Sequence, residues 1–199
     1  LSSNKAVPIL EDREGNIWIG ASVGLDRLRA ANVVVEPGIA RSSRFGYMQF
    51  ADRDGAVWVA DSDSVYQALP GQAPKRVRDR LDNPTALCQD KAGAMWLGSS
   101  DALTRLGTPP RTVAPPVPPA SPYFGCVIDG RGDLWLALFA TGYGRLDAQG
   151  RWTVFPPLAP EAVYNNIGID REGRVLLPRA RALTRLAADG AVQTLRPPP

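Results

Sequence analysis

A short stretch recurs five times along the chain and restricts the folds open to it. It starts with Asp, has Gly three residues later, and ends in an aliphatic–Trp–aliphatic run, as in residues 12–19. The five repeated Asp residues are 40, 38, 39 and 41 positions apart, at Asp12, Asp52, Asp90, Asp129 and Asp170. A nearly constant period of about 40 residues indicates a repeat architecture.

Each copy predicts two β-strands joined by a tight polar turn. Apolar runs lie on both sides of the turn, the Gly supplies a positive φ, and the Asp carboxylate accepts turn amides. A Trp in the middle of the second strand is large enough to fill the space between neighbouring sheets. The fifth copy has Leu176 in place of Trp. The residues expected to have these structural roles are Asp12, Gly15, Trp18, Asp52, Gly55, Trp58, Asp90, Gly93, Trp96, Asp129, Gly132, Trp135, Asp170 and Gly173.

Two more short strands complete each repeat, for example residues 24–28 and 33–35 in the first copy. Four strands in about 40 residues are typical of one blade of a β-propeller. We therefore predict an all-β chain that forms a single β-propeller of five four-stranded blades. The expected blades are residues 1–40, 41–80, 81–118, 119–158 and 159–199. Five blades could close into a ring or form an arc of a larger one.

Residues 1–20 closely resemble the two-component regulator propeller repeat. That repeat occurs in the extracytoplasmic sensor regions of bacterial hybrid histidine kinase-like receptors. The resemblance covers essentially the whole chain and is strongest in the first repeat and weakest in the fifth. It implies a periplasmic or extracytoplasmic sensor module whose parent protein is membrane-anchored. Since the sequence starts with Leu1 and ends at a blade edge, we expect it to be a piece of a longer polypeptide.

The rings of this family usually have more than five blades, so the resemblance favours an arc of a larger ring. An arc would leave two apolar blade faces open, and such faces favour association. Self-association of the chain is therefore expected.

The absence of one residue type from the sequence excludes several kinds of active site. The sequence contains no histidine, which excludes Ser-His-Asp and Cys-His triads and the common zinc sites within it. Virginiamycin-inactivating lyases have a similar repeat, but their mechanism relies on histidine. We therefore expect no enzyme, no cofactor and no metal site. The net charge of +3 comes without a basic stripe interleaved with aromatic residues, so no nucleic-acid partner is expected.

The two cysteines, Cys88 and Cys126, lie two and three residues before the repeated Asp of their copies. Successive side chains of a strand point to opposite faces. On neighbouring inner strands the two thiols should therefore point apart, which predicts free, buried cysteines.

A binding site is expected at the mouth of the central channel. In a propeller, the loops that enter the innermost strands share one rim with the loops that join the second and third strands, and these loops vary between repeats. Asp61 and Asp63 belong to this rim. Tyr, Asn and Arg side chains suit a sugar or another small polar ligand. The candidates are Arg44, Tyr47, Asn83, Tyr123, Tyr164, Asn165, Asn166, Arg179 and Arg181.

The sequence therefore predicts a non-enzymatic sensor module that binds a small polar ligand or transmits a signal by conformational change. A protein–protein interaction scaffold is the alternative, with another protein as its partner. A propeller lyase or lactonase is the third hypothesis, which the missing histidine disfavours.

Overall fold

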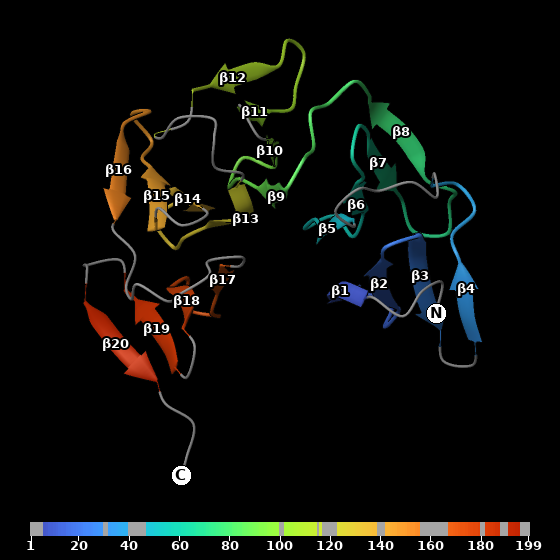
Figure 1. Cartoon of the computed structure of the whole chain (residues 1–199), viewed down its shortest axis with the longest axis horizontal. Coiled ribbons are helices and arrows are strands. Elements are labelled where there is room, and N and C mark those ends of the chain that lie inside the picture. The colour runs from blue at the N-terminus through green and yellow to red at the C-terminus, as the bar shows by residue number, and fades with distance from the viewer. Residues whose placement is uncertain are drawn as a thin grey trace. The chain divides into compact units, whose positions relative to one another are not determined.

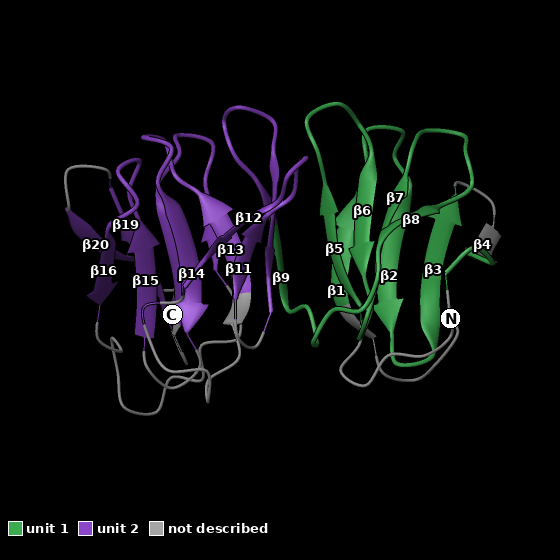
Figure 2. Ribbon diagram, turned by 90° about the horizontal axis from the view of Figure 1, so that it is seen from above, with its two compact units in different colours: residues 1–87 green, residues 88–199 purple. Residues whose placement is uncertain are grey.

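A computed structural model describes residues 6–29, 32–39, 47–99, 102–114, 116, 123–138, 142–155, 167–179, 182–187 and 191–195. The chain divides into two compact units, residues 1–87 and 88–199, which Figure 2 colours separately. Each unit is described by itself.

The strands form five four-stranded antiparallel sheets, each with its strands in sequence order (Figure 1). Blade 1 contains β1 (Ala6–Glu11), β2 (Ile17–Ala21), β3 (Gly24–Arg29) and β4 (Asn32–Val35). Blade 2 contains β5 (Met48–Ala51), β6 (Val57–Ala60), β7 (Val65–Ala68) and β8 (Lys75–Arg78). Blade 3 contains β9 (Ala86–Gln89), β10 (Met95–Gly98), β11 (Leu103–Arg105) and β12 (Arg111–Val113). Blade 4 contains β13 (Tyr123–Ile128), β14 (Leu134–Leu138), β15 (Gly142–Leu146) and β16 (Trp152–Phe155). Blade 5 contains β17 (Gly168–Ile169), β18 (Val175–Arg179), β19 (Ala182–Leu186) and β20 (Val192–Leu195).

These sheets confirm the predicted all-β fold of five four-stranded β-propeller blades. Among the described residues, no helix is long and apolar enough to cross a membrane. The arc of a larger ring and the self-association of the chain stay predictions.

The repeated turn has the predicted chemistry. In blade 1 the amide of Gly15 donates to the carbonyl of Asp12, and Gly15 has a φ of +76°. Oδ1 of Asp12 accepts the amides of Glu14 and Asn16, each at 2.9 Å. A residue with a Cβ is disfavoured at this φ, so the Gly lets the short hairpin close.

Trp18 and Trp135 pack between neighbouring sheets, as predicted. In unit 1, Trp18 of β2 is buried in a cluster with Val57 and Val59 of β6. In unit 2, Trp135 of β14 is buried with Val175 and Leu177 of β18. One face of a blade therefore packs against the opposite face of the next blade.

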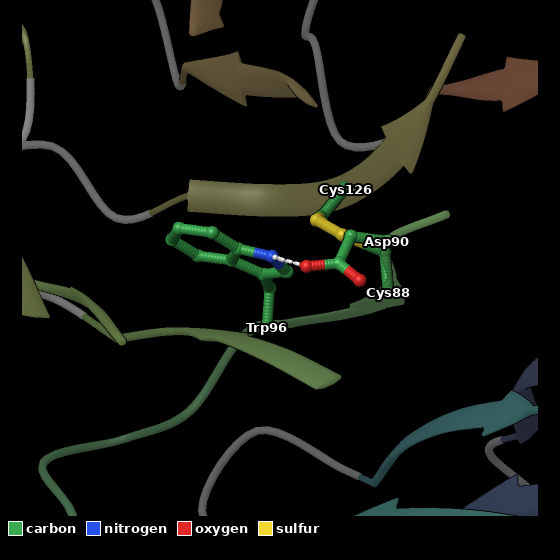
Figure 3. The surroundings of a disulfide bond; sticks show 4 residues. All are labelled: Cys88, Asp90, Trp96 and Cys126. Carbon is green, nitrogen blue, oxygen red and sulfur yellow. Dashed lines mark hydrogen bonds between the residues drawn. A yellow bond between two sulfur atoms is a disulfide. The ribbon is translucent and has the colours of Figure 1, made fainter. Parts of the chain in front are cut away.

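The prediction of free thiols is wrong, because Cys88 and Cys126 form a disulfide in unit 2 (Figure 3). Their side chains do leave opposite faces of their own sheets. Because one blade packs against the opposite face of the next, those two faces meet in the space between β9 and β13. The Cα atoms are 5.5 Å apart, a separation that suits a disulfide.

Candidate ligand-binding sites

The turn between β6 and β7 is one candidate site at the predicted rim. Oδ1 of Asp61 accepts the amides of Asp63 at 3.0 Å and Ser64 at 2.7 Å. The Ser64 hydroxyl donates to Oδ1 of Asp63 at 2.7 Å. These bonds hold two carboxylates in one four-residue turn.

The connection from β8 to β9 lies against this turn. The amide of Leu81 donates to the carbonyl of Asp63 at 2.9 Å, and the amide of Asn83 donates to the carbonyl of Ser62 at 3.0 Å. Asn83 adopts a φ of +47°, a conformation that Asn tolerates better than most residues. The structure thus places Asn83 beside the second-to-third strand loop of the preceding blade, the arrangement that the rim hypothesis uses.

The pKa of Asp61 is shifted in the opposite direction from those of the repeated turn carboxylates Asp12, Asp90 and Asp170. Burial raises the pKa of its carboxyl group, and the neighbouring charge of Asp63 raises it further, although the two amide hydrogen bonds act in the opposite direction. Asp61 is only 2% exposed. The turn therefore buries the Asp61 carboxyl group and presents the more exposed Asp63 to a polar ligand.

The other predicted rim residues do not join this group in the described structure. Tyr47 is 1% exposed and packs in the apolar cluster around Trp18. Tyr123 and Arg179 lie in β13 and β18, with side chains outside the described part. The remaining candidates also lie outside the described residues: Arg44, Tyr164, Asn165, Asn166 and Arg181.

Two cavities between consecutive blades were not predicted from the sequence. Both lie at the blade end that carries the repeated Asp turns, and both include the Asp and Trp of the earlier blade. The first, in unit 2 between blades 3 and 4, has a volume of about 190 Å³ and includes Asp90 and Trp96. The second, in unit 1 between blades 1 and 2, has a volume of about 180 Å³ and includes Asp12 and Trp18. Pockets for drug-sized ligands usually measure about 300–1,000 Å³, so these suit smaller molecules.

An arginine of the third strand lies beside the Trp in three blades. Arg27 lies over the ring of Trp18 at 5.1 Å and is 3.9 Å from the Glu36 carboxylate. In blade 3 Nε of Arg105 donates to Oδ2 of Asp90 at 2.9 Å. In blade 4 Arg145 lies 5.8 Å from the ring of Trp135. This Arg recurs in the sequence at the position opposite the Trp, and that recurrence is the signal that could have located the cavities.

The described residues contain no group of three or more His, Cys, Asp or Glu side chains that could hold a metal ion.

Comparison with known proteins supports the fold and part of the resemblance. Residues 1–22 match the two component regulator propeller family, which confirms that resemblance for the N-terminal repeat. No curated protein sequence matches the chain at a significant level.

Several solved structures have a similar fold. Virginiamycin B lyase from Staphylococcus aureus has a TM-score of 0.80 at 14% identity, covering 98% of this chain and 72% of the lyase. The extracellular domain of a protein assigned as a one component system from B. thetaiotaomicron has a TM-score of 0.71 at 14% identity. That match covers 98% of this chain and 31% of the other. A gluconolactonase from Xanthomonas campestris has a TM-score of 0.67 at 17% identity, covering 96% of this chain and 72% of the enzyme. At these identities the likeness shows the β-propeller fold alone.

Proposed function

We propose that this chain is a non-enzymatic sensor module in the extracytoplasmic part of a bacterial signalling receptor. The observation that carries the proposal is the match of residues 1–22 to the two component regulator propeller. The fold likeness to the extracellular domain of a one component system agrees with it.

The disulfide supports an extracytoplasmic location. Cys88 and Cys126 are both buried and joined between two blades. Disulfides form and persist mainly in oxidising compartments such as the periplasm. A propeller that is exported before it folds would acquire this bond there.

The chemistry of the turn carboxylate Asp90 supports a role other than catalysis. Burial alone would raise the pKa of Asp90, but hydrogen bonds from Arg105, Trp96 and the amide of Ala94 lower it overall. A carboxylate that is fixed in this way and ionised at neutral pH is a poor proton donor. With no histidine in the sequence, the usual general base is also missing.

The ligand of the sensor is proposed to bind at the rim beside Asn83. The side chain of Asn83 has no hydrogen-bonding partner among the described residues. The backbone of Asn83 contacts the turn that contains the carboxylate of Asp63. An amide and a carboxylate together can donate to and accept from the hydroxyl groups of a sugar.

A titration of the chain with glucose, galactose, glucuronate and galacturonate, followed by calorimetry, tests this site. We expect at least one sugar to bind, and the Asn83→Ala variant to bind it about tenfold more weakly, since one or two hydrogen bonds are lost. Gln72→Ala is the matched control, because Gln72 lies in a turn at the other end of blade 2. Equal binding by both variants would contradict the rim site.

A lyase is the second candidate, favoured only by the fold likeness to virginiamycin B lyase. Incubation of the chain with virginiamycin B, with Mg²⁺ present and absent, separates the two functions. Turnover of the antibiotic would refute the non-enzymatic proposal.

A further inference from the structure

The cavity between blades 3 and 4 has a smaller residue in its lining than blade 4 has at the equivalent position. Val113 of β12 pairs with Leu103, and Phe155 of β16 pairs with Tyr143 at the equivalent register of the next blade. Phe155 stacks on Trp135, with ring centroids 5.1 Å apart. Val113 is several atoms smaller than Phe and leaves the space beside Trp96 open, with a volume of about 190 Å³.

One part of the lining of this cavity is apolar and the other part is polar. Its apolar lining comes from Trp96, Val113, Ile128, Leu134 and Leu146. An apolar cavity of about 150 Å³ holds a benzene molecule in other proteins. The space therefore has the size and surface for one six-membered ring that carries a small substituent.

Among the described residues, the charged groups of the lining leave one cation without a counter-ion. Asp90 accepts hydrogen bonds from Arg105 and Trp96 through one oxygen, and Asp147 is bonded to Arg151 at 2.9 Å. Arg111 also lines the cavity, and no described residue forms an ion pair or a hydrogen bond with its guanidinium group.

A second positive charge lies at the edge of the cavity. The Lys91 ammonium donates to the carbonyl of Gly130 in blade 4, next to Gly132 of the lining. Since both lining carboxylates already have an Arg partner, the charge available to a ligand is positive.

The corresponding cavity of unit 1 has a different set of charged residues. It includes the carboxylates of Asp12, Glu14 and Asp54 and the guanidinium groups of Arg13 and Arg27, of which Arg27 lies near Glu36. A shared position in the repeat therefore gives two cavities of similar size with different charged linings.

We propose that the cavity between blades 3 and 4 binds a small organic carboxylate whose body is a single six-membered ring. The ring lies against Trp96 and the aliphatic lining, and the carboxylate pairs with the Arg111 guanidinium group, whose fork geometry suits a carboxylate. This site is separate from the rim and does not depend on the signalling role proposed above.

The test is a titration with benzoate, followed by Trp fluorescence and checked by calorimetry. Binding in the millimolar range is expected for a ligand of this size. Two variants introduce the residue types that blade 4 has at the equivalent positions. Arg111→Thr, which matches Thr153, removes the cation and should weaken binding about tenfold. Val113→Phe, which matches Phe155, should fill the cavity and abolish binding.

Benzamide is a neutral ligand of nearly the same shape as benzoate. It should bind the unaltered chain about tenfold more weakly than benzoate does, and it should bind Arg111→Thr as weakly as it binds the unaltered chain. Urea unfolding of each variant establishes that it is folded. Benzoate binding that is absent in the unaltered chain, or that is unchanged in both folded variants, would overturn the proposal.

Discussion

The indole nitrogen of Trp18 donates a 2.8 Å hydrogen bond to Oδ2 of Asp12, and this bond links the hairpin turn to the packing between blades. The other oxygen of Asp12 already accepts turn amides. Blades 2, 3 and 4 have the same Asp–Trp bond at 2.8, 3.0 and 2.9 Å. In each of these blades one carboxylate thus fixes both the turn and the orientation of the Trp indole.

Blade 5 shows how the turn works without Trp. Nε of Arg174 donates to Oδ2 of Asp170 at 2.7 Å, and Nε of Arg185 lies 3.1 Å from the same oxygen. Arg174 therefore supplies the hydrogen bond that the indole provides in the other blades, where the sequence of blade 5 has Leu176.

The first prediction concerns two substitutions that give the repeated turn of blade 3 the residues found in blade 5. Trp96→Leu should lower the free energy of unfolding by about 2–4 kcal/mol, because it removes buried volume and one hydrogen bond. Adding Ala94→Arg places an Arg at the position of Arg174 and should restore about 1 kcal/mol of that loss. Urea unfolding of both variants measures the difference. A double variant no more stable than the single one would contradict the interchange of indole and guanidinium donors.

The second prediction concerns acid stability and compares two carboxyl groups. The folded-state pKa of Asp90 is depressed, so its contribution is present above the usual Asp value of 3.8 and is lost as the pH falls through the folded pKa. Asp90→Asn should cost about 1–3 kcal/mol at pH 7 and progressively less as the solution becomes more acidic.

Asp61 should behave in the opposite way. Burial raises the folded-state pKa of Asp61 above 3.8. Ionisation of Asp61 therefore destabilises the fold as the pH rises from 3.8 through the folded-state pKa. Asp61→Asn should therefore leave stability at pH 7 unchanged or increased. Urea unfolding at pH 4 and pH 7 checks both variants, and equal losses at pH 7 would contradict the assigned directions.

The third prediction concerns the disulfide. The loop between Cys88 and Cys126 spans 38 positions, and closing a loop of this length stabilises a fold by about 4 kcal/mol in the chain-entropy account. The Cys88→Ala/Cys126→Ala variant should lose about 2–4 kcal/mol in urea unfolding. Dithiothreitol should destabilise the unaltered chain and leave this variant unchanged. A variant as stable as the oxidised chain would show that the bond does not support the blade interface.

Local chemistry was predictable from the sequence where one repeat contains all the interacting groups. The Asp–Gly turn and the mid-strand Trp follow from residues within seven positions of one another, and both were predicted correctly. The disulfide was missed because it depends on which faces of two different sheets meet. Tyr47 illustrates the same limit: a Tyr before an inner strand suits a rim loop, but its ring packs in the cluster with Ile39 and Trp18. The cavity between blades 3 and 4 was also missed, because Val113 lines it beside Trp96 while Phe155 stacks on Trp135, and these contacts between strands are visible only in the packed structure.

The last prediction separates backbone strain from steric collision at two equivalent glycines. Gly15 and Gly173 have φ values of +76° and +77°. A Cβ on Gly15 would have no atom within 4 Å, so Gly15→Ala should cost only the strain of a left-handed residue, about 1–2 kcal/mol. A Cβ on Gly173 would lie 2.6 Å from Cα of Gly130, and the Gly173 carbonyl accepts the Gly130 amide at 2.8 Å. Gly173→Ala should therefore cost about 1–3 kcal/mol more than Gly15→Ala, because the two blades must move apart. Urea unfolding of the two variants gives the comparison. Equal losses would mean that the contact between the turns of blades 4 and 5 contributes nothing to stability.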